Sequence, residues 1–140
     1  MKKSISKFKV RYYETDKMGV VHHSNYVRWL EMGRESYLDD ILGKSYVDFE
    51  KEGYISPIKD VSIKYLKPCT YGDEITIYTW VCEVKPAKVT FEYEIYKNLD
   101  VLVSKAKTTL VFVSDKTFIP LNMKKEIPEI YTKYLENIIK

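Results

Sequence analysis

The sequence predicts an α+β domain in which an antiparallel sheet curves around one long helix. Apolar residues recur with helical spacing over residues 25–42, and from Pro57 onward they instead alternate with polar residues in successive runs. A sheet with one apolar face and a single long helix to cover it forms a two-layer domain. Because the 140 residues contain no repeat, linker or low-complexity tract, we expect one domain spanning residues 1–140.

Alternating residues define the strands. Phe8, Val10 and Tyr12 alternate with basic residues and predict a half-buried strand over residues 6–13. Further alternations cover residues 61–65, 75–85, 89–96 and 101–113. Strands of this length leave a sheet edge to protect, which favours association of two copies through that edge.

The long helix has recognisable ends. Ser24 or Asn25 is well placed as its N-cap, and Gly43 follows its last turn. Arg34 belongs to the polar face, which mostly carries charged residues. A short second helix is expected within residues 45–54, and a closing helix begins with Pro128 at its first position.

Composition excludes several classes of function. The net charge is only +3 and the basic residues are scattered among acidic ones, which argues against nucleic-acid binding. No 18-residue apolar stretch predicts a membrane span, and no apolar core follows the N-terminal lysines as in a signal peptide, so we expect a cytoplasmic protein. Cys69 and Cys82 fit no metal-binding spacing and are expected to be inert thiols.

The segment YYETDKMGVVHHSNY, residues 12–26, is the candidate reaction centre. It leads into a helix N-terminus, whose first amides lack intrahelical partners and can polarise a carbonyl. Gly19 permits a sharp bend that brings Asp16 back toward those amides. A carboxylate facing a polarised carbonyl can attack it directly or deprotonate an attacking water, and either route transfers an acyl group to water.

Less specific readings of the same residues remain open at this point. Asp16 could be a turn or capping residue, and His23 a structural hydrogen-bonding group. A metal site at His22 and His23 is disfavoured because neighbouring side chains point apart and no third ligand has suitable spacing.

A family resemblance favours the catalytic reading. The stretch RYYETDKMGVVHHSNYVRWLEMGRESYL, residues 11–38, resembles the signature of hotdog-fold acyl-CoA thioesterases, in the branch of 4-hydroxybenzoyl-CoA thioesterase and the Tol–Pal-cluster acyl-CoA thioesterases. YLKPCTYGDEI, residues 65–75, is similar to a second family motif, and the resemblance covers roughly residues 6–130. It implies a hotdog fold, assembly as homodimers or homotetramers, and hydrolysis of an acyl-CoA without a cofactor, since coenzyme A is part of the substrate.

The resemblance also assigns roles to residues. Asp16 falls on the family's essential carboxylate, and His23 on the position whose backbone N–H binds the thioester oxygen. Tyr13, Gly19 and Asn25 match positions that line the substrate pocket or shape it. His22 departs from the Tyr-His pattern of the branch and is expected to face solvent.

Three further assignments are weaker. Glu31 competes with Asp16, because another hotdog branch uses a helical Glu, but its place two turns into the helix favours a structural role. Lys85 and Lys88 flank a turn where related enzymes bind the nucleotide phosphates, although solvated lysines are equally expected there. The alternatives to an acyl-CoA thioesterase are an acyl-carrier-protein thioesterase and a non-catalytic acyl-CoA-binding module.

Overall fold

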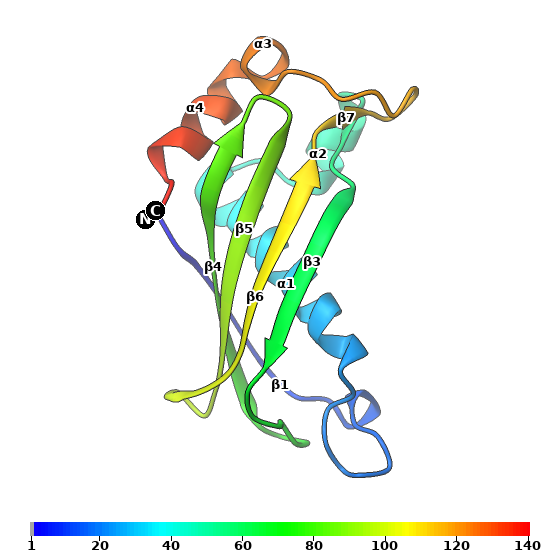
Figure 1. The fold of residues 1–140 in the computed structure, drawn as a ribbon, viewed down its shortest axis with the longest axis vertical. Helices are drawn as coiled ribbons and strands as arrows, with labels where there is room; N and C mark the ends of the chain where they lie inside the picture. Colours follow the sequence, from blue (N-terminus) through cyan, green and yellow to red (C-terminus); the bar gives the residue numbers. More distant parts are fainter. Residues whose placement is uncertain (1) are drawn as a thin grey trace.

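The computed structural model describes residues 2–140 and has the two-layer architecture expected from the sequence (Figure 1). The main elements are β1 (Ser4–Lys9), α1 (Ser24–Tyr37), α2 (Tyr46–Lys51), β3 (Ile58–Tyr65), β4 (Glu74–Lys85), β5 (Lys88–Lys97), β6 (Val101–Val111) and α4 (Pro128–Glu136). Smaller elements are η1 (Tyr12–Glu14), η2 (Leu38–Leu42), β2 (Tyr54–Ile55), β7 (Val113–Ser114) and α3 (Met123–Glu126).

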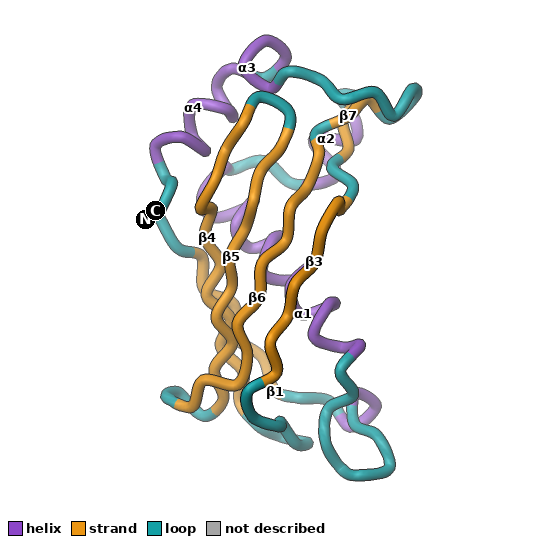
Figure 2. Tube along the Cα trace, in the orientation of Figure 1, coloured by secondary structure: helices purple, strands orange, loops and turns teal. Residues whose placement is uncertain are grey.

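Five strands form one antiparallel sheet in the order β1-β4-β5-β6-β3. The sheet curves around α1 (Figure 2), and the strand order makes β1 and β3 its two edges. β2 and β7 pair separately as a two-stranded ribbon. This arrangement confirms the predicted α+β hotdog architecture.

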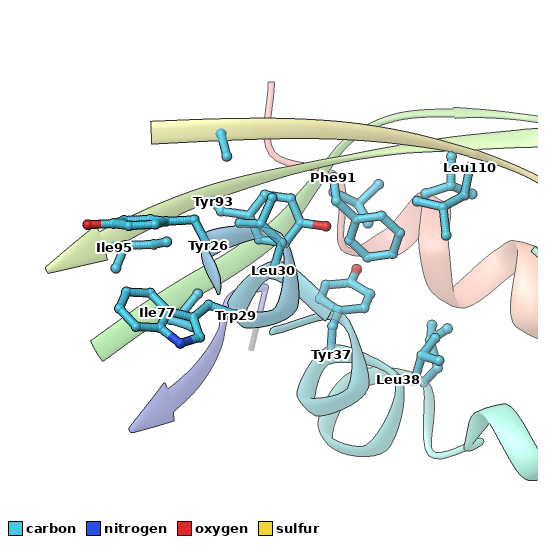
Figure 3. Packing of buried hydrophobic residues seen from close by; sticks show 14 of the residues in the cluster. Tyr26, Trp29, Leu30, Tyr37, Leu38, Ile77, Phe91, Tyr93, Ile95 and Leu110 are labelled. Carbon is cyan, nitrogen blue, oxygen red and sulfur yellow. The ribbon is translucent and has the colours of Figure 1, made fainter. Parts of the chain in front are cut away.

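The helix α1 packs directly on the concave face of the sheet. Trp29, Leu30 and Tyr37 are fully buried, and they face strand residues that include Ile77, Phe91 and Ile95 (Figure 3). Gly33 makes this close approach possible, because a Cβ at this position would overlap Oγ1 of Thr79 on β4. The helix is therefore held rigidly over the strands, and its N-terminus has a fixed position at one end of the sheet.

Two predicted strand boundaries are wrong. β1 ends at Lys9 instead of continuing to residue 13, because the chain turns into the short 3₁₀ helix η1. Tyr12 is 75% exposed there, whereas the alternation had placed it with Phe8 on the buried face. The last long strand ends at Val111 instead of residue 113, and β7 follows as a separate element.

The helix predictions are largely confirmed. The helical stretch begins at Ser24 and extends through Leu42, its last part being the π-helical turn η2. Gly43 ends it with a φ of 68°, which favours glycine. Pro128 stands at the start of α4 as predicted. The placement of Arg34 on the polar face is wrong: its side chain is 4% exposed, because Tyr46 and Tyr93 supply hydroxyl partners inside the fold.

Both cysteines are free, and burial raises the pKa of each thiol, that of Cys82 to about 11 with Glu92 contributing. A raised pKa means less thiolate at a given pH. We expect alkylation of Cys82 at pH 8 to be about 100-fold slower than that of a cysteine peptide whose thiol has the ordinary pKa of 9.0. Labelling with iodoacetamide, followed by mass spectrometry, measures this; rates that match those of the urea-unfolded protein would contradict it.

Among the helices of residues 2–140, none has both the length and the apolar character needed to cross a bilayer.

Candidate active site

The loop between β1 and α1 holds Asp16 in a defined position. Thr15 pairs with Val21, and the turn between them is closed by the bond from the Gly19 N–H to the Asp16 carbonyl oxygen (3.0 Å). Gly19 has a φ of 80°, as the sharp bend predicted from the sequence requires. Oδ1 of Asp16 accepts a hydrogen bond from the Met18 N–H (2.9 Å). No group among residues 2–140 donates to Oδ2 of Asp16, so one carboxylate oxygen is available for chemistry.

At the start of α1, one backbone amide has no acceptor among the residues that the structure describes. The N–H of Ser24 donates to Nδ1 of His22 (3.2 Å), that of Asn25 to the His22 carbonyl (3.0 Å), and that of Tyr26 to the His23 carbonyl (3.2 Å). The N–H of His23 has no acceptor within residues 2–140. It lies at the positive end of the helix dipole, where an oxyanion is favoured.

The same contacts correct the predicted cap. His23, rather than Ser24 or Asn25, is the residue that precedes the helix, and its side chain makes no capping bond. His22 is exposed as predicted, yet its ring closes the helix start by accepting from Ser24.

Asp16 and His23 line one hollow of about 320 Å³, together with Tyr26 and Tyr65. Tyr65 donates from its hydroxyl to the His23 carbonyl (3.2 Å), and its ring meets that of Tyr26 edge-on at 4.9 Å. Burial raises the pKa of both tyrosines, so both hydroxyls stay neutral. The hollow thus combines a carboxylate, an unengaged amide and neutral aromatic walls, which suits nucleophilic or general-base attack on a polarised carbonyl.

A residue that was not singled out from the sequence, Glu14, anchors this loop. Its buried carboxylate accepts from the backbone N–H of Arg11 (2.8 Å) and from Nε1 of Trp29 (2.8 Å). Its carbonyl oxygen accepts from the N–H of His22 (2.9 Å) and from Nδ2 of Asn25 (2.9 Å). In the sequence, Trp29 on the apolar face of the helix could have indicated such a residue, because a buried indole N–H needs an acceptor nearby.

Other predicted site residues lie apart from the hollow. Asn25 is buried, and its hydrogen bond to the Glu14 carbonyl joins α1 to the loop. Tyr13 is 77% exposed. Both residues line a second cavity, together with the exposed Glu31. Lys85 and Lys88 flank the β4–β5 turn, at the opposite end of the sheet from the Asp16 loop (Figure 1). One chain therefore brings Asp16 and His23 together but not the two lysines.

Comparison with known proteins places the chain in a family. Residues 10–133 match the model of the thioesterase-like superfamily. The chain is 38% identical over 131 residues to the putative acyl-CoA thioesterase YneP of Bacillus subtilis (94% of each chain), and 29% identical over 119 residues to the acyl-CoA thioesterase YbgC of Haemophilus influenzae (85% of this chain, 87% of that one). A structure of a DHNA-CoA thioesterase from Staphylococcus aureus superposes with a TM-score of 0.92 at 35% identity, covering 97% of this chain and 91% of that chain. The chain belongs to the thioesterase-like superfamily.

Proposed function

We propose that this thioester hydrolase cleaves acyl-CoA thioesters to a free acid and coenzyme A in the hollow between Asp16 and His23. The observation that carries the proposal is that one hollow is lined both by Asp16, whose Oδ2 accepts from no group among residues 2–140, and by His23, whose N–H donates to none of them. The thioesterase names of its relatives support the reaction, and the block of residues 11–38 supports placement in the 4-hydroxybenzoyl-CoA and Tol–Pal-cluster branch.

The chemistry uses both groups at once. The N–H of His23 donates to the thioester oxygen and stabilises the charge that develops on it. Asp16 then either attacks the carbonyl carbon, expelling the thiolate of coenzyme A and leaving an anhydride that water opens, or takes a proton from a water that attacks. Both routes consume one water and yield one carboxylic acid and one thiol.

Detection of released thiol tests the proposal over short-chain, long-chain and aromatic acyl-CoAs, with the same acyl groups on an acyl-carrier protein run in parallel. We expect thiol release from at least one class of acyl-CoA, and slower release from the carrier protein. Saturable binding of acyl-CoA with no thiol release from any substrate would instead identify a binding module.

We also propose that two copies associate through β3. Within residues 2–140 this strand pairs only with β6. Its other side is an edge, and the strand carries exposed apolar side chains at Ile58, Val61 and Tyr65. An unpaired strand of eight residues is a template for a further strand. A second copy of the same strand, running antiparallel, would extend the sheet across a two-fold axis.

Charge selects the register of this pairing. With the axis at Ser62, Asp60 of each copy faces Lys64 of the other, which places opposite charges across the interface twice. If the axis moved by one residue, to Val61 or Ile63, Asp60 would lie opposite Ser62 or Leu66 and both attractions would be lost. In this antiparallel pairing the Ile58 end of β3 lies beside the Leu66 end of the strand in the second copy, so the end that carries Lys85 and Lys88 in one copy comes to the Asp16 end of the other.

Charge reversal tests the register. Asp60→Lys should weaken the dimer about tenfold or more, because two attractions become two repulsions. The double variant Asp60→Lys, Lys64→Asp should restore it, and Asp100→Lys, in the β5–β6 turn, should leave it unchanged. Sedimentation velocity over a concentration series measures the dissociation constant. A monomeric wild type, or a double variant no better than the single one, would contradict the proposed edge.

A further inference from the structure

A cavity with a mostly apolar lining lies away from Asp16, beneath the C-terminal half of α1. It has a volume of about 480 Å³ and is walled by α2, the sheet and α4. Most of its lining is apolar, with Phe49, Phe91, Leu110, Phe112 and Tyr134 among the contributors. A cavity of this size and character fits a small apolar or aromatic group.

One charged side chain, Arg34, is buried in the wall of this cavity. Its guanidinium donates from Nη1 to the Tyr93 hydroxyl (3.1 Å) and from Nε to the Tyr46 hydroxyl (3.3 Å). Burial raises the pKa of both tyrosines, so they are neutral and offer dipoles rather than a counter-charge. The ion pairs described for residues 2–140 involve Arg11, Lys44 and Lys107, and none includes Arg34.

A buried guanidinium without a carboxylate is costly, and it retains donors beyond the two that the tyrosines engage. An oxygen atom of a ligand in the cavity would accept from them. Glu31 and Glu50 also line the cavity and are exposed. Their negative charges at its mouth repel a ligand that carries a carboxylate of its own. A neutral oxygen, such as a hydroxyl or a carbonyl, meets both conditions.

We infer that this cavity binds the acyl group of the substrate and that Arg34 selects acyl groups carrying a neutral oxygen substituent. The inference rests on the proposed hydrolysis and on the β3 interface. In the register centred on Ser62, the end of β3 near Leu66, at the Asp16 hollow of one copy, lies beside the end near Ile58, which lines this cavity in the other. The thioester at Asp16 would then extend its acyl group into the cavity of the second copy.

Matched substrates that differ by one oxygen test the selection. Benzoyl-CoA is compared with its three monohydroxy isomers, and decanoyl-CoA with its ω-hydroxy analogue. We expect the wild type to favour the best hydroxylated member of at least one set by about tenfold or more in kcat/KM, because a site with a buried donor rejects a ligand that leaves it unpaired.

Arg34→Met is expected to reduce this preference to about twofold or less, since the side chain keeps its length but loses every donor. Arg28→Met, the same substitution on the exposed side of α1, should retain the preference. If Arg34→Met does not fold, as judged by thermal unfolding, Arg34→Lys carries the test: it keeps the charge with a different donor geometry and should show a preference below that of the wild type.

The outcomes separate the two proposals. Hydrolysis of plain and hydroxylated substrates at equal kcat/KM by the wild type would overturn the role of Arg34 while leaving the hydrolase intact. An unchanged preference in a folded Arg34 variant would do the same. No hydrolysis of any acyl-CoA would overturn the proposed function itself, and the inference with it.

Discussion

Asp16→Asn is expected to lower kcat for acyl-CoA hydrolysis by about 10²- to 10⁴-fold, the range attributed to a positioned general base. The amide can neither take a proton from water nor attack the thioester. The loop should keep its shape, because the side-chain oxygen of Asn can still accept from the Met18 N–H as Oδ1 of Asp16 does. Steady-state thiol release, together with an unchanged midpoint of thermal unfolding, measures this.

Glu31→Gln is the matched control, since it makes the same change at the competing carboxylate. Glu31 is exposed and lines the two cavities on either side of α1 rather than the hollow that holds Asp16. We expect its kcat to stay within a few-fold of the wild type. The opposite pattern, a large loss for Glu31→Gln and none for Asp16→Asn, would transfer the catalytic role to the helix.

Glu14→Gln is expected to reduce the free energy of unfolding by about 1–3 kcal/mol, the cost of leaving one buried donor unsatisfied. The carboxylate of Glu14 accepts from two N–H groups, those of Arg11 and of the Trp29 indole. A carboxamide has only one oxygen, so its NH₂ group must face one of these donors. Because the Glu14 carbonyl also holds His22 and Asn25, kcat/KM should fall with the loosened loop.

Urea denaturation gives the change in unfolding free energy, and Glu35→Gln on the exposed face of α1 is the control, expected within about 0.5 kcal/mol of the wild type. Equal stabilities of Glu14→Gln and Glu35→Gln would show that the buried carboxylate does not hold the loop.

Local features explain what could be predicted from the sequence. The helix over residues 25–42 is long and strongly periodic, and Asp16, Gly19 and His23 are close along the chain, so their arrangement follows from one bend. Whether they meet at a single hollow depends on Tyr65, which is 42 residues from His23 in the sequence and reaches it only through the curvature of the sheet.

What could not be predicted depends on contacts between distant segments. Periodicity places Arg34 among charged residues of the helix. Its burial depends on the hydrogen bond to Tyr93, which is 59 residues further along the chain. The apolar alternation of β1 continues past the end of the strand because Val10 is still buried. The backbone N–H of Val10, however, bonds to the carbonyl of Asp73, which lies outside the partner strand β4. The acyl-sized cavity combines residues from nine elements, and no short segment of the chain contains its pattern.

A crystal structure of the Asp16→Asn variant soaked with an intact acyl-CoA would show directly where the thioester carbonyl binds. We predict the thioester oxygen within hydrogen-bond distance of the His23 N–H, roughly 2.7–3.1 Å, and the carbonyl carbon facing the side chain of residue 16. A thioester bound beside Glu31, with the His23 N–H left unengaged, would contradict catalysis by Asp16 and the His23 amide.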